Sequence, residues 1–121
     1  MNTETAIKEA LGIDGAIGAA LVDYESGMCL HSGGGGQGFD IEVAAAANTE
    51  VVRSKVRALS MLGLDDRVED ILITLGGQYH VIRLLEQTGG SLFLYLALDR
   101  QRGNLALARH KLRQIDVELV I

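Results

Sequence analysis

The residues best suited to metal or nucleophilic chemistry are one cysteine and three histidines, and their spacing is unfavourable for both. Cys29 and His31 alternate along a predicted strand and therefore share one of its faces. His80 and His110 lie far away in the sequence and have no ligand spacing. A zinc site needs three or four ligands, and a cysteine nucleophile needs a nearby base whose position the sequence does not give. We therefore predict no metal site and interpret the three histidines as structural or surface residues.

A run of glycines, residues 33–36 with Gly38, separates a predicted strand from the start of a predicted helix. A helix start after a glycine loop is a place where anions bind. The run lacks the Gly-Lys-Ser/Thr ending of a phosphate-binding loop, and no parallel strand-helix-strand unit follows it. We interpret residues 33–38 as a flexible loop and predict no nucleotide or other cofactor site.

Two acidic pairs, Asp65-Asp66 and Glu69-Asp70, are the remaining candidates for acid–base chemistry. They flank a predicted helix end and a predicted strand start, and no pattern pairs them across a cleft. No set of residues with catalytic spacing is present, so we predict no catalytic residues and a protein that is not an enzyme.

Composition narrows the class of protein further. The chain of 121 residues is 48% hydrophobic and 22% charged, which is typical of one globular domain, predicted over residues 1–121. A net charge of −5 and the absence of tryptophan argue against nucleic-acid binding. No apolar run reaches the roughly 18 residues of a membrane span. With one cysteine and no signal-peptide pattern, we expect a cytoplasmic protein without membrane insertion.

The helices and strands that carry these residues can be predicted from the spacing of apolar residues and from the positions of turn residues. The predicted order is helix, two strands, helix, three strands, helix. Short loops within each group of strands favour antiparallel pairing, so the fold class is α+β, with one five-stranded antiparallel sheet and helices on both faces. The predicted ranges are 3–11, 16–23, 28–32, 40–62, 68–75, 79–85, 91–98 and 102–119.

The middle helix, residues 40–62, has more apolar surface than one sheet can cover. On a helical wheel its apolar arc exceeds half the circumference, whereas a helix on a sheet needs a stripe of roughly 100°. Asn48 and Lys55 lie inside this arc. Either a second copy of the helix packs here across a two-fold axis, or the small alanines merely widen the stripe. The opposite face carries charges of both signs.

The last helix, residues 102–119, carries a basic stripe of Arg102, Arg109 and Arg113 beside its apolar line. We interpret the stripe as a solvated face. It is also the rival position for a partner that does not dock on the middle helix.

Two stretches of the sequence resemble the roadblock / dynein light-chain family. Residues 68–85, VEDILITLGGQYHVIRLL, resemble the strand-turn-strand of that family. Residues 92–112, LFLYLALDRQRGNLALARHKL, resemble its last strand and the opening of its final helix. The resemblance spans roughly residues 5–118, agrees with the predicted order of elements, and is stronger for bacterial members. The glycine-rich loop 33–38 is longer than usual for the family.

The resemblance implies a two-fold dimer, in which the third strand pairs with its mate at the sheet edge and the middle helices pack side by side. It also implies that the dimer binds a small Ras-like GTPase and either stimulates GTP hydrolysis or only tethers the GTPase. Independently, Ile71 and Ile73 in the third strand would be an aggregation hazard at a bare edge. The expected dimer-interface residues are Asn48, Val51, Lys55, Leu59, Ile71 and Ile73, and the expected partner surface is Glu42, Thr49, Glu50, Arg53 and Arg57.

A small-molecule sensor is the alternative class of function. Domains with a similar order of elements bind ligands between sheet and helix, which requires a roomy pocket with convergent polar groups. The test is whether side chains fill the space between the sheet and the helices.

Overall fold

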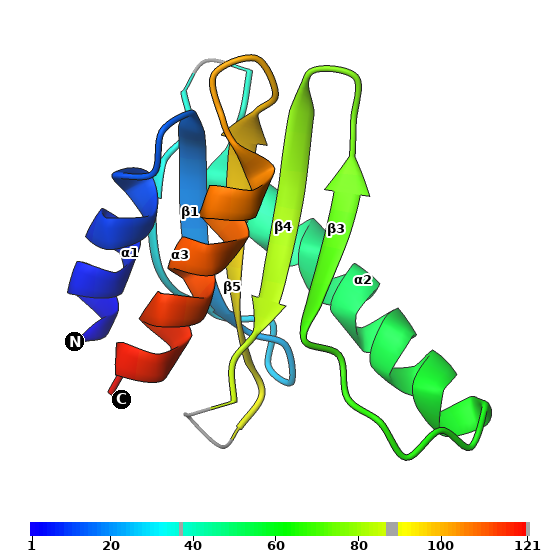
Figure 1. The fold of residues 1–121 in the computed structure, drawn as a ribbon. Coiled ribbons are helices and arrows are strands. Elements are labelled where there is room, and N and C mark those ends of the chain that lie inside the picture. Colours follow the sequence, from blue (N-terminus) through cyan, green and yellow to red (C-terminus); the bar gives the residue numbers. More distant parts are fainter. Residues whose placement is uncertain (37, 87–89, 121) are drawn as a thin grey trace.

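A computed structural model describes residues 1–36, 38–86 and 90–120, and it confirms the predicted fold class. One five-stranded antiparallel sheet has the strand order β2-β1-β5-β4-β3 and carries three helices (Figure 1). The helices are α1 (Thr3–Leu11), α2 (Ile41–Met61) and α3 (Leu105–Glu118). The strands are β1 (Ala16–Asp23), β2 (Cys29–Gly34), β3 (Asp70–Thr74), β4 (Gln78–Leu84) and β5 (Leu92–Asp99).

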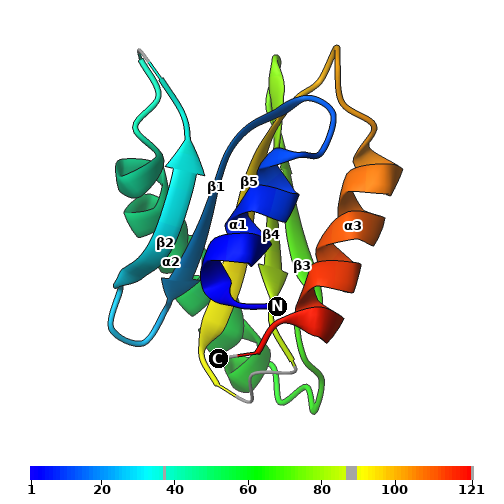
Figure 2. The same cartoon turned by 90° about the vertical axis from the view of Figure 1, so that its left-hand side faces the viewer.

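The helices form two layers on opposite faces of the sheet. Figures 1 and 2 show α1 and α3 side by side on one face, while α2 crosses the other face diagonally and extends past β3. Each layer has its own core of buried side chains, with Ile7 and Leu112 central to the first and Val52 and Tyr95 to the second. Because β5 and β1 lie in the middle of the sheet, their residues are buried on both faces.

The start of α2 is fixed by a local signal. Asp40 caps the helix, and its carboxylate accepts hydrogen bonds from the backbone N–H groups of Glu42 (3.0 Å) and Val43 (3.3 Å). Gly63, with φ of 68°, follows the helix in the left-handed region, which a glycine adopts without strain. The predicted range 40–62 therefore matches the helix to within one residue at each end.

The glycine run is not entirely a loop, and this part of the prediction is wrong. Gly33 and Gly34 extend β2 and pair with Ala19 and Gly18 of β1. A Cβ atom on Gly33 would lie 2.7 Å from Leu11 Cδ1, so the missing side chain lets α1 pack closely on this edge of the sheet. The rest of the run, except the undescribed Gln37, connects β2 to α2.

A buried ion pair joins the sheet to α3. Arg83 on β4 donates from Nε to Asp116 Oδ2 at 3.2 Å, and Asp116 Oδ1 accepts the backbone N–H of Glu86 at 3.1 Å. Side-chain exposure is only 8% for Arg83 and 3% for Asp116. These residues sit in segments that the sequence predicts as strand and helix, but nothing in their spacing of 33 positions predicts that they meet.

Candidate protein-interaction surface

The outward side of α2 carries a mostly apolar seam, which the described chain leaves exposed at its centre and half-covers at its two ends. Five small residues follow one another at alternating spacings of three and four, which is the heptad pattern of paired helices. We call them the α2 seam: Ala44, Ala47, Val51, Ser54 and Ala58. Val51 is 36% exposed, and a shallow apolar groove runs beside it between Glu50 and Lys55. The predicted excess of apolar surface on this helix is therefore present in the folded chain.

The side of α2 that faces the sheet is filled. Ile41, Ala45 and Val52 are buried against β1, β2 and β5. Tyr95 on β5 is fully buried, and burial raises the pKa of its hydroxyl to about 12, although a hydrogen bond with Asn48 acts in the opposite direction. Side chains thus occupy the space beneath the N-terminal half of α2, which speaks against an enclosed ligand pocket there.

A histidine completes this filled region. His80 Nδ1 lies 3.3 Å from the Tyr95 hydroxyl, and His80 Nε2 lies 2.8 Å from Gln78 Oε1. Phe39 packs edge-on against the imidazole, with ring centroids 6.1 Å apart. Burial lowers the pKa of His80, because the charged imidazolium loses water contacts. This geometry agrees with the interpretation of His80 as a structural residue.

Two of the residues predicted on α2 are buried against the sheet. Asn48, predicted in the dimer interface, is 7% exposed, and its Nδ2 donates to the Ala44 carbonyl at 2.9 Å. Thr49, predicted on the partner surface, is 2% exposed, and its hydroxyl donates to the Ala45 carbonyl at 3.2 Å. The prediction that Thr49 is exposed is wrong, and Asn48 has almost no surface left to contribute to a dimer interface. The carbonyl four residues earlier satisfies each polar group and lets it face the core.

The other residues predicted for the dimer interface occupy two places. Val51 and Lys55 are exposed along the α2 seam, and Leu59 is half-buried near the end of the helix. Ile71 and Ile73 are half-buried on β3 and pack against the core beneath α2. In the described chain β3 pairs with β4 alone, so its other side is a free sheet edge.

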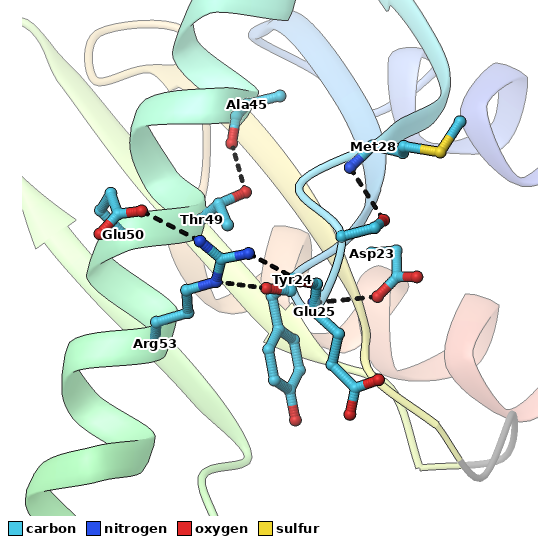
Figure 3. A network of polar contacts seen from close by, with 9 residues as sticks. Asp23, Tyr24, Glu25, Met28, Ala45, Thr49, Glu50 and Arg53 are labelled. Carbon is cyan, nitrogen blue, oxygen red and sulfur yellow. Dashed lines mark hydrogen bonds and ion pairs between the residues drawn. The ribbon is translucent and has the colours of Figure 1, made fainter.

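Arg53, predicted as a solvent-facing charge, instead clamps α2 to the turn between β1 and β2 (Figure 3). Its Nε donates to the Tyr24 carbonyl at 2.6 Å, and its Nη2 donates to the Glu25 carbonyl at 2.8 Å. Its Nη1 also pairs with Glu50 Oε1 at 3.2 Å. The side chain is 35% exposed, so it contributes to the outer surface only in part. Glu42, Glu50 and Arg57 are exposed.

We expect Arg53→Ala to release this turn. The change removes two hydrogen bonds from a charged donor to backbone carbonyls, so the free energy of unfolding should fall by about 1–3 kcal/mol. Amide hydrogen exchange at residues 24–28 should become faster, as NMR can measure. Arg57→Ala, on an exposed position of the same helix, is the control and should change stability by less than about 0.5 kcal/mol. Unchanged exchange in the turn of the Arg53→Ala variant would contradict the clamp.

The predicted basic stripe does not lie wholly on α3, because the helix begins at Leu105 and Arg102 precedes it. Two of its three arginines form ion pairs. Arg109 holds Asp70 at the start of β3 in a bidentate ion pair, with Nε–Oδ2 at 2.8 Å and Nη2–Oδ1 at 3.1 Å. The hydrogen bond to Asp70 raises the pKa of Arg109. Arg102 lies 3.7 Å from Asp99. Arg113 is exposed, and no ion pair involves it among the described residues. The stripe is therefore a weaker docking surface than its sequence indicates.

The described part of the chain contains no group of three or more His, Cys, Asp and Glu side chains that could hold a metal ion. Cys29 is the first residue of β2, and its Sγ donates to the His31 carbonyl at 3.6 Å. Desolvation raises the pKa of the Cys29 thiol, which disfavours the nucleophilic thiolate.

No described helix has the length and apolar character needed to cross a bilayer.

Solved structures with a similar fold include roadblock and MglB proteins. The chain aligns with MglB of Myxococcus xanthus with a TM-score of 0.74 and 18% identity, over 94% of this chain and 85% of that one. It aligns with a Roadblock/LC7 domain of Streptomyces avermitilis with a TM-score of 0.77 and 13% identity, over 97% and 93%. For the gliding protein MglB of Thermus thermophilus the values are 0.67 and 17%, over 95% and 88%. No protein-family model and no curated protein matches the sequence.

These alignments define the class of protein by its fold. Sequence identities below one fifth show the fold alone, and the alignments extend over nearly the whole of this chain. The chain has a roadblock-like fold, and the resemblance drawn from residues 68–85 and 92–112 is confirmed at the level of the fold.

Proposed function

We propose that this chain, acting as a single domain over residues 1–121, forms a homodimer that binds and regulates or scaffolds a small Ras-like GTPase. The exposed α2 seam, on a helix that extends past the free edge of β3 (Figure 1), is the observation that carries the proposal. An apolar helix face and an unpaired strand edge are both costly to leave in water. A two-fold dimer would cover both at once. The roadblock-like fold supports this assembly, because the family resemblance of the sequence implies a two-fold dimer.

The small residues of the α2 seam suit a close antiparallel helix pair. A two-fold axis near Val51 would bring Val51 beside its own copy and Ala44 beside the partner subunit's Ala58. Alanine and serine side chains allow helix axes to approach to the short end of the usual range of about 8–10 Å. Lys55 would then lie at the margin of the interface, where its ammonium group can reach water.

The remaining outward residues of α2 form the proposed GTPase surface. Glu42, Glu50 and Arg57 are exposed and charged, and each would occur twice around the two-fold axis. Arg53 would support this surface by holding the turn of Tyr24 and Glu25 in place. Paired charges of this kind mainly set association rate and specificity. A partner that straddles the axis would bind once per dimer.

The proposal is tested by direct binding to the small Ras-like GTPases of the source organism. Each GTPase is loaded with GDP or with a non-hydrolysable GTP analogue and measured by biolayer interferometry against the immobilised dimer. We expect one GTPase to bind in a nucleotide-dependent manner. Hydrolysis assays with that GTPase then decide between stimulation and tethering. Absence of binding to every GTPase in both nucleotide states would contradict the proposal.

Charge reversal locates the docking surface. We expect Arg57→Glu to weaken GTPase binding about tenfold, mainly through a slower association rate. Arg113→Glu makes the same change at an exposed position on α3 and should leave binding unchanged. Association and dissociation rates at two salt concentrations provide the readout. A loss confined to Arg113→Glu would move the docking surface to the opposite layer.

A further inference from the structure

A second concave surface lies on the other side of α2. It is bounded by the C-terminal half of that helix, the end of β4 and the start of β5. The groove has a volume of about 650 Å³, within the range of roughly 300–1,000 Å³ that is typical of ligand sites. Eight of its lining residues are aromatic or aliphatic: Tyr24, Val56, Leu59, Leu64, Val68, Leu84, Leu85 and Leu92.

The groove exists because α2 leaves the sheet before it ends. Val52 is the last residue of the helix that is buried, although the helix continues to Met61. Figure 1 shows this half of α2 extending diagonally beyond β3. As a result Val56 is 37% exposed and Leu64, in the connection to β3, is 53% exposed. Apolar side chains that line a concave surface and remain open to water are typical of docking sites.

The rim of the groove is acidic. Asp66 and Glu86 line it directly, together with Arg67. Arg67 forms ion pairs with both Glu86 and Glu69, so this one cation is already shared between two carboxylates. Asp65, next to Asp66, adds a further negative charge at the same end. The described side chains around the opening, Asp65, Asp66, Arg67, Glu69 and Glu86, therefore carry a net negative charge, which favours a basic partner.

We propose that this groove binds a short segment of a partner protein, with bulky apolar side chains inserted between α2 and the sheet and flanking lysines or arginines against the acidic rim. The groove faces the sheet side of α2, whereas Glu42, Glu50 and Arg57 face outward. The two surfaces can therefore be occupied at the same time. This inference does not depend on whether a GTPase binds the outer face.

The experiment uses a fluorescein-labelled peptide of leucines flanked by lysines as the probe, with the full chain in its native assembly. Fluorescence anisotropy measures affinity, and ¹H–¹⁵N NMR spectra locate the contact. We expect shift changes to concentrate at groove residues such as Val56, Leu64 and Leu84. Ser60→Trp, which places an indole in the groove, should weaken binding about tenfold. Asp65→Lys with Asp66→Lys should weaken it by a similar factor.

The matched control is Glu4→Lys with Glu118→Lys, which makes the same change in net charge on the α1–α3 layer. Binding should stay within about twofold of the natural chain. An equal loss in this control would show attraction to net charge alone and overturn the proposal. Shift changes outside the groove, or full affinity in Ser60→Trp, would also overturn it. Val51→Glu, a change in the α2 seam, is expected to give a monomer. Peptide binding to that monomer without binding to the dimer would also overturn the proposal, because a second copy of the chain would then occupy the groove.

Discussion

Replacing Asp116 by alanine is expected to lower the free energy of unfolding by about 3–5 kcal/mol, since it leaves the buried guanidinium of Arg83 without its counter-charge. The Arg83 side chain is 8% exposed, so water cannot replace the lost carboxylate without opening the contact between β4 and α3. The change also removes the acceptor for the backbone N–H of Glu86. Urea unfolding followed by circular dichroism measures the effect.

Two further variants separate a buried ion pair from simple packing. The double change Arg83→Met with Asp116→Leu removes both charges and should recover most of the stability, because a well-packed apolar pair replaces a buried ion pair at little cost. Arg113→Ala, on the exposed side of the same helix, should change stability by less than about 0.5 kcal/mol. A loss below about 1 kcal/mol for Asp116→Ala would contradict this role.

The second large effect is expected at the α2 seam. Val51→Glu should convert the proposed dimer into a monomer, because two carboxylates would be buried side by side across the two-fold axis. A penalty of about 2.7 kcal/mol raises a dissociation constant about a hundredfold, and burial of an unpaired charge costs at least this much. Light scattering across a concentration series should give the mass of one 12.9 kDa chain instead of two.

The control for this prediction changes an equally apolar position on the other layer. Leu107 on α3 is 65% exposed, and Leu107→Glu should leave the dimer intact. Val51 tests the dimer more directly than Ile73 does. Ile73 also packs against the core beneath α2, so its replacement would weaken the fold itself. If Val51→Glu remains a folded dimer, the interface lies elsewhere, and the free edge of β3 is the next candidate.

The predicted elements were accurate where the signals are local. The strand at 16–23 and the helix at 3–11 have the predicted bounds. The start of α2 follows from the Asp40 cap, whose hydrogen bonds reach no further than Val43. The edge strand, predicted at 68–75, is shorter in the structure and begins at Asp70. Asp70 pairs there with Arg109 of α3, and the local pattern of residues cannot predict a contact between positions so far apart in the sequence.

The order of elements and the excess of apolar surface on α2 follow from residue types and spacing alone, because helical and strand periods are local properties of the chain. Which side of α2 meets the sheet depends on how the helix packs in the folded chain. A wheel places Asn48 and Lys55 together in one arc, yet the crossing of α2 over β1 buries Asn48 and leaves Lys55 exposed. The contact of Arg53 with the β1–β2 turn and the Arg83–Asp116 ion pair also depend on tertiary packing. Their partners lie 29 and 33 positions away, and a distance along the chain does not specify a distance in space.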